Sequence, residues 1–268
     1  MPSTLFDGKQ LSYTDSGAGE GQRDKPSLLF IHAFTCNASL WDGMIARFAS
    51  RYRCLAFDLP GHGQSEPNDQ ASDMGLLADC AAAVLDAAGV ETAHVCGLSI
   101  GGMIAQKFGL SYPERAASLT IACSTGRLAP EAGPMWRARL EAISSKGIWS
   151  QVESTMERWF GEGLMARFEP ADLDPIARMI ATTTVAGALS CGRAVKAHDL
   201  LDELPALTVP TLVIGGEKDL SFPASHPEAL AQAIPGAKLV MLTDAGHLAP
   251  VQVPDAFEAA LGDFLARV

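Results

Sequence analysis

The turn around Ser99 constrains the fold of this chain more than any other feature. An apolar run over residues 93–98 leads into the serine, a helical pattern follows it directly, and Gly97 and Gly101 lie two positions to either side. This G-x-S-x-G spacing between a strand and a helix predicts a sharp elbow with the serine at its apex. Side chains at either glycine would collide across such a turn. Ser99 is therefore a candidate nucleophile, and a helix-capping role is the weaker alternative.

The rest of the chain alternates between short apolar runs and helical patterns. Strands are predicted over residues 28–31, 54–57, 94–96, 119–122, 211–214 and 239–242. Helices are predicted over residues 76–88, 100–110, 225–233 and 256–266. Continuous apolar strands separated by helices indicate a parallel sheet that is covered on both faces. The segments near Leu5 and Leu11 precede this pattern and are expected to form an antiparallel edge hairpin.

The middle of the chain lacks a strand pattern. Helical segments are predicted there over residues 134–145, 148–160, 175–190 and 192–200. The sequence therefore predicts an α/β core from residues 1–126 and 205–268, with a helical cap inserted at residues 127–204. Trp136, Trp149 and Trp159 lie in this insertion and are candidates to line a pocket, although packing between helices is the simpler explanation for each one.

Composition excludes several classes of partner. The 268 residues carry a net charge of −11, which argues against binding to nucleic acid or to an anionic membrane. No apolar stretch approaches 18 residues and no leader pattern opens the chain, so a soluble, cytoplasmic protein is expected. The six cysteines form no C-x-x-C pair, and no nucleotide or metal motif is present. We therefore predict no cofactor and no metal; a homo-oligomer stays open.

A serine nucleophile needs a base, and three histidines follow Ser99 in the chain. His247 follows a predicted strand directly, in the position where open α/β sheets place their sites. His198 lies in the helical insertion, and His226 begins a predicted helix where it is expected at the surface. His247 is therefore the candidate base.

The base in turn needs an orienting carboxylate. Asp219 follows the strand at 211–214, with room for one helix and one strand before His247. Glu217 is the rival, and its alternative role is a solvated loop carboxylate near Lys218. Asp244 is close to His247 in sequence, but a role in shaping the turn is expected for it.

A developing oxyanion needs two backbone N–H donors. Ile100 follows the nucleophile and opens a helix, whose dipole favours negative charge. The second donor should come from the loop after an early strand, where the amide of Phe34 fits. His32 in the same loop is interpreted as a structural brace.

These segments together resemble the α/β-hydrolase superfamily over nearly the whole chain. The resemblance is carried by residues 32–34, the glycine-rich turn at 58–65, residues 97–102, Asp219 and residues 245–247. It implies a mostly parallel sheet flanked by helices, with a helical cap. Within the superfamily the chain is similar to bacterial 3-oxoadipate enol-lactonases, on residues 97–103, 112–115, Trp136 with Arg139, 157–160, and Asp219 followed by 223–224. The loop at 32–37 departs from the Ser-Asn-Ser-Leu-Gly-like loop of those lactonases and is nearer to that of general esterases.

The resemblance implies a serine hydrolase that cleaves a small lactone or carboxylic ester through an acyl-enzyme. A general carboxylesterase, a carbon–carbon bond hydrolase and a cofactor-free perhydrolase use the same triad, and a non-catalytic receptor is the alternative from another class. Trp136 and Arg139 are three residues apart on a predicted helix and share one face. Arg139 is expected to bind an anionic substrate beside a Trp136 wall, with Trp159 as a third substrate contact; pairing with glutamates on the solvated face of the insertion is the alternative.

Overall fold

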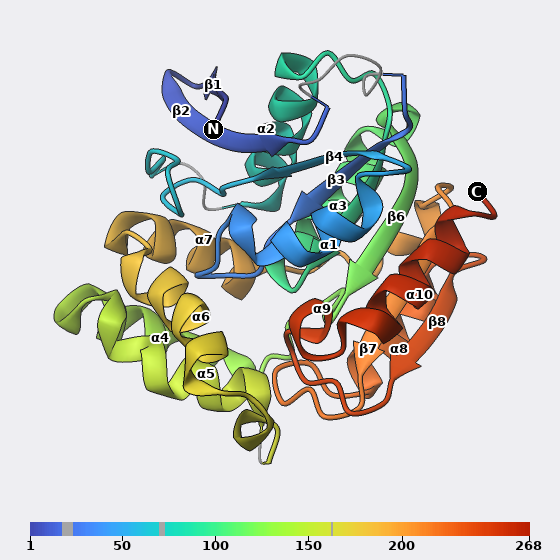
Figure 1. Ribbon diagram of the computed structural model, residues 1–268. Coiled ribbons are helices and arrows are strands. Elements are labelled where there is room, and N and C mark those ends of the chain that lie inside the picture. Colours follow the sequence, from blue (N-terminus) through green and yellow to red (C-terminus); the bar gives the residue numbers. More distant parts are fainter. Residues whose placement is uncertain (18–23, 70–72, 162) are drawn as a thin grey trace.

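The computed structural model describes residues 1–17, 24–69, 73–161 and 163–268. Within these ranges eight strands form one sheet, in the order β1-β2-β4-β3-β5-β6-β7-β8 (Figure 1). The strands are β1 Ser3–Phe6, β2 Lys9–Asp15, β3 Ser27–Ile31, β4 Arg53–Phe57, β5 Ala93–Leu98, β6 Ala116–Ala122, β7 Thr211–Gly216 and β8 Lys238–Leu242. Strands β3 to β8 are parallel, and β1 and β2 add the antiparallel edge. Both features confirm the sequence prediction.

Successive side chains of the central strands supply two separate cores, one on each face of the sheet. On β3, Leu28 and Phe30 belong to one core, whereas Leu29 and Ile31 belong to the other. One face is covered by α2 Met74–Ala87, α3 Ile100–Ser111 and α8 Ser225–Ala233, and the other by α1 Asp42–Phe48 and α10 Pro254–Leu265. Burial on both faces explains why these strands read as continuous apolar runs.

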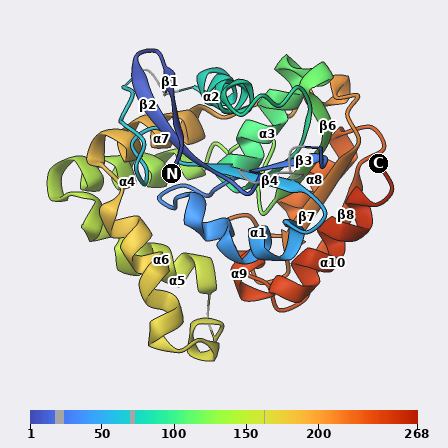
Figure 2. The same cartoon turned by 45° about the horizontal axis from the view of Figure 1, so that its top comes forward.

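Among the described residues, four α-helices lie between β6 and β7 in the chain. They are α4 Ala132–Lys146, α5 Val152–Phe160, α6 Pro170–Thr182 and α7 Val185–Ala197. In both views they form one block on the side of the molecule away from β8 and the C-terminus (Figures 1 and 2). We call this block the cap. Among the described residues, no helix of the cap or the core is long and apolar enough to cross a bilayer.

The predicted division of the later cap helices was wrong. A break was expected just before Gly192, but α6 ends at Thr182 and α7 begins at Val185, where the Thr184 side chain accepts a hydrogen bond from the Gly187 amide. Gly192 lies inside α7, and a Cβ at this position would come within 2.5 Å of the Leu140 side chain. The glycine therefore permits close packing between α7 and α4 and does not end a helix.

Candidate active site

The elbow predicted at Ser99 is present at the end of β5. Ser99 has φ 58° and ψ −116°, a conformation that costs energy for any residue with a side chain. A Cβ on Gly97 would lie 2.0 Å from the Gly101 carbonyl oxygen, and a Cβ on Gly101 would lie 2.2 Å from that of Ile31. The Ser124 hydroxyl donates to the Ser99 carbonyl at 2.8 Å. Packing and hydrogen bonding thus hold the strained turn in place.

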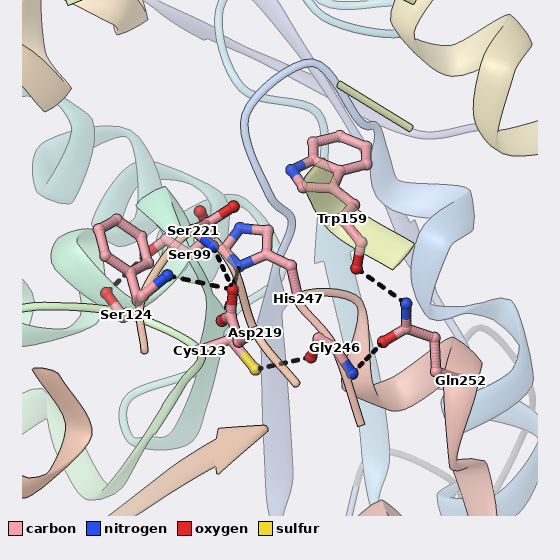
Figure 3. A network of polar contacts seen from close by, with 10 residues as sticks. Ser99, Cys123, Ser124, Trp159, Asp219, Ser221, Gly246, His247 and Gln252 are labelled. Atoms are coloured by element: carbon pink, nitrogen blue, oxygen red, sulfur yellow. Dashed lines mark hydrogen bonds and ion pairs between the residues drawn. The ribbon is translucent and has the colours of Figure 1, made fainter. Parts of the chain in front are cut away.

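His247 and Asp219 meet at the carboxyl ends of β8 and β7 (Figure 3). The His247 Nδ1 lies 2.9 Å and 3.1 Å from the two carboxylate oxygens of Asp219. The amides of Ser221 and Phe222 also donate to Asp219 Oδ1, at 2.7 Å and 3.1 Å. Because the carboxylate only accepts, Nδ1 carries the proton and Nε2 is left as an acceptor. Ser99 and His247 line the same cavity.

The rival candidates lie elsewhere. Glu217 accepts a hydrogen bond from the Thr243 hydroxyl at the surface. Asp244 forms a hydrogen-bonded ion pair with Lys218, which holds the pKa of that carboxyl below its usual range. His198 is buried and its Nε2 bonds the Thr125 carbonyl, outside the cavity. Of the carboxylates in the described parts of the chain, Asp219 is the one that contacts His247.

Of the two residues expected to donate to the oxyanion, Ile100 follows Ser99 in the chain and Phe34 lines the same cavity as Ser99. Ile100 is the first residue of α3, so its N–H has no acceptor within the helix. Phe34 follows β3 and lines the cavity with Ser99. His32 braces this loop: its Nδ1 donates to the Ala33 carbonyl at 2.8 Å, and its Nε2 accepts from the Leu59 amide at 2.9 Å. Burial lowers the pKa of His32 to about 4, which keeps the ring neutral in that role.

The cavity lies between core and cap and has a volume of about 170 Å³. Helices α4 and α5 supply Trp136, Arg139, Arg158 and Trp159 to its wall. The three residues that the sequence singled out for substrate binding therefore all face Ser99 across one space. Trp149, by contrast, is 69% exposed and does not line the cavity.

Arg139 is a partly buried cation with few partners. Its Nη2 donates to the Thr155 hydroxyl at 2.9 Å, and its guanidinium carbon lies 5.0 Å and 5.2 Å from the ring centres of Phe34 and Trp136. Burial, with Arg158 nearby, lowers the pKa of Arg139 to about 9, so the side chain stays charged at neutral pH. No described carboxylate lies within ion-pair distance of it, so the alternative of a glutamate pair on the solvated face was wrong for this residue.

The end of α5 is tied to the loop that carries the candidate base. The Trp159 carbonyl accepts from the His247 amide at 2.9 Å and from Gln252 Nε2 at 3.0 Å, and the Trp159 ring stacks on the His247 ring with centres 6.0 Å apart. Gln252 Oε1 accepts from the Gly246 amide at 2.8 Å. Gln252, on α9 Ala249–Gln252, thus joins the cap to the base (Figure 3). Nothing in the sequence pattern singled it out.

The sequence prediction for the position of His226 was also wrong. It was expected at the surface, but it is partly buried and lines the cavity together with Ser221 and Phe222. Its position depends on how the loop after β7 turns toward the cap, which a helix-start pattern does not report.

Comparisons with known proteins agree with this architecture. The profile described as alpha/beta hydrolase fold matches residues 26–252. The chain is 29% identical to 3-oxoadipate enol-lactonase 1 from Acinetobacter baylyi over 248 residues, which covers 92% of this chain and 91% of the relative. The enol-lactonase structure from Burkholderia xenovorans superposes with a TM-score of 0.93 at 29% identity, covering 99% of this chain and 100% of that one.

A thermophilic esterase from Thermogutta terrifontis, solved with malate bound, is similarly close. It superposes with a TM-score of 0.88 at 28% identity, covering 99% of this chain and 96% of its own. Esterases and lactonases thus stand together among the similar proteins. The fold, the family profile and these neighbours place the chain in the alpha/beta hydrolase fold family.

Proposed function

We propose that this protein is a serine hydrolase that cleaves a small lactone or carboxylic ester through an acyl-enzyme. The observation that carries the proposal is the Asp219–His247 pair, which leaves the His247 Nε2 free as an acceptor in the cavity that holds Ser99. A serine hydroxyl is a poor nucleophile without such a base. The strained turn at Ser99 is the second support, since it presents the hydroxyl to this cavity.

The proposed reaction has two halves. The Ser99 Oγ bonds to the substrate carbonyl carbon while its proton moves to His247 Nε2, and the amides of Phe34 and Ile100 stabilise the oxyanion. The carbon–oxygen bond to the leaving alcohol then breaks as His247 returns the proton to that oxygen. A water molecule, deprotonated by His247, then attacks the acyl carbon; the bond from that carbon to Ser99 Oγ breaks, His247 returns the proton to Oγ, and the acid is released. Asp219 keeps the imidazole in the required tautomer throughout.

Arg139 indicates the substrate class. A partly buried cation that has two aromatic rings and one hydroxyl as neighbours, and no carboxylate partner, gains stability when an anion joins it. We infer that a substrate carboxylate binds there, with Trp136 and Trp159 as apolar walls. A carboxylated lactone, most like the enol-lactone named in the relatives' 3-oxoadipate enol-lactonase activity, satisfies this requirement. A general carboxylesterase is the second candidate, favoured by the oxyanion loop at 32–37.

Labelling with a fluorophosphonate tests the nucleophile directly. We expect one adduct per chain, located on Ser99 by peptide mass spectrometry and lost in Ser99→Ala. A chain that takes up no label would favour a binding role without catalysis. A panel of lactones and esters, with and without a carboxylate, then separates the two candidate activities.

A further inference from the structure

His226 is a second imidazole in the cavity, and the proposed reaction does not use it. It lies in the first turn of α8, and its ring packs edge-on against Phe222 with centres 5.3 Å apart. The ring of Phe222 in turn lies 5.7 Å from that of His247. One aromatic side chain therefore separates His226 from the proposed base.

Hydrogen bonding fixes the tautomer of His226. The Thr125 hydroxyl donates its proton to the Arg127 carbonyl at 2.6 Å, so its oxygen can only accept from other groups. His226 Nδ1 lies 2.9 Å from that oxygen and must therefore be the donor. Burial lowers the pKa of His226, which favours the neutral ring. In the neutral ring Nε2 then has a free lone pair, and no donor from the described chain reaches it.

Ser221 adds a second polar group to this side of the cavity. Ser221 lines the cavity, and its buried hydroxyl oxygen has no hydrogen-bond partner among the residues described. Buried polar atoms almost always have a partner, so an orphaned hydroxyl beside an active-site cavity indicates a polar ligand. His226 and Ser221 thus form a polar wall with unfilled hydrogen-bonding capacity.

Arg139 and His226 contact different parts of the proposed machinery. Arg139 packs on Phe34, whose amide is the proposed oxyanion donor, and we assign the acyl part of the substrate to this side. His226 contacts Phe222, whose ring also contacts that of His247, the group that would protonate the leaving oxygen. We propose that His226 Nε2 accepts a hydrogen bond from a hydroxyl or N–H on the alcohol side of the substrate. This inference rests on the proposed hydrolysis at Ser99. It defines the preferred substrates as carboxylated esters or lactones with a donor a few bonds beyond the leaving oxygen.

Two esters of the same acid test this proposal. Mono(2-hydroxyethyl) succinate and monopropyl succinate both carry a carboxylate and have alcohol parts of equal length, but only the first has a terminal donor. The readout is the ratio of their kcat/KM values. We expect His226→Phe to lower this ratio about three- to tenfold, through loss on the hydroxyethyl ester alone. His226→Gln, which retains an acceptor oxygen, should restore part of it.

Two further variants complete the design. Thr125→Val removes the acceptor that fixes Nδ1 and lies outside the cavity lining, so it should also lower the ratio even if His226→Phe folds poorly. His94→Phe is the matched control: His94 pairs with Ser118 on the sheet away from the cavity, and the ratio should not change.

An unchanged ratio in His226→Phe, or equal losses on both esters, would overturn the proposal. Failure of the proposed hydrolysis itself would look different: the wild-type protein would cleave neither ester and would take up no fluorophosphonate at Ser99.

Discussion

The core and the cap contribute different kinds of residue to the cavity. Around the candidate base and the oxyanion loop, the polar groups of the core satisfy one another: Asp219 accepts three donors, and His32 uses both ring nitrogens. On the cap side, Arg139 is partly buried and contacts one hydroxyl and two ring faces. We infer from this difference that Asp219 and His32 are held in place before substrate arrives, whereas Arg139 is left for the substrate to complete.

The largest expected effect lies on the core side. Ser99→Ala should lower kcat for any ester by about four orders of magnitude or more, because the acyl-enzyme cannot form. Turnover of a chromogenic short-chain ester measures it, with the thermal midpoint as a control for folding. Near-normal turnover would remove Ser99 as the nucleophile and with it the division of roles between core and cap.

The free energy of unfolding should fall at acidic pH, because two buried histidines of the core resist protonation. Burial lowers the pKa of His32 to about 4 and that of His62 to about 3, against an ordinary value of 6.5. Below pH 6.5 the unfolded chain therefore binds more protons than the folded chain, and the free energy of unfolding falls as the pH drops toward 3. Denaturant titrations at several pH values measure this slope. His62→Gln should flatten it; the same slope in that variant would show that His62 contributes nothing to it.

The tie between core and cap should have an intermediate effect. Gln252→Leu removes the acceptor of the Gly246 amide and one of the two donors to the Trp159 carbonyl. The loss of these hydrogen bonds should lower the free energy of unfolding by about 1–3 kcal/mol. It should also lower kcat about tenfold, since His247 is held through the same carbonyl. Steady-state kinetics on the folded variant measure this second effect. A loss of stability with unchanged kcat would mean that Gln252 supports the fold without positioning the base.

The smallest expected effect is on stability, and it is a gain where the Gln252 variant shows a loss. Arg139→Met removes a partly buried cation that lacks a carboxylate partner, and it keeps an apolar side chain at that position. The free energy of unfolding should stay the same or rise by up to about 2 kcal/mol. Chemical denaturation checks it. A clear loss of stability would show that the ring and hydroxyl contacts fully compensate the charge, and that Arg139 serves the fold.

The strands of the core and the loops that follow them could be predicted from local sequence patterns. Strand β5, the Ser99 elbow and the loops that carry Asp219 and His247 each combine a continuous apolar run with adjacent glycines, so the sequence shows where each strand ends and which loop comes next. Gln252 and His226 could not be found in this way, because their roles depend on which distant backbone groups they meet. Gly192 misled for the same reason, since its packing against Leu140 outweighs its tendency to break a helix.

The most direct test of the core–cap division compares one carboxylated lactone with its neutral methyl ester in the wild type and in Arg139→Gln. We expect Arg139→Gln to lose about tenfold or more in kcat/KM on the anion, because a charge-assisted hydrogen bond contributes about 1.5–3 kcal/mol. The neutral ester should be cleaved at nearly the wild-type rate, because Asp219, His247 and Ser99 are untouched. Equal losses on both substrates, or no loss on either, would contradict the assignment of selectivity for the anion to the cap.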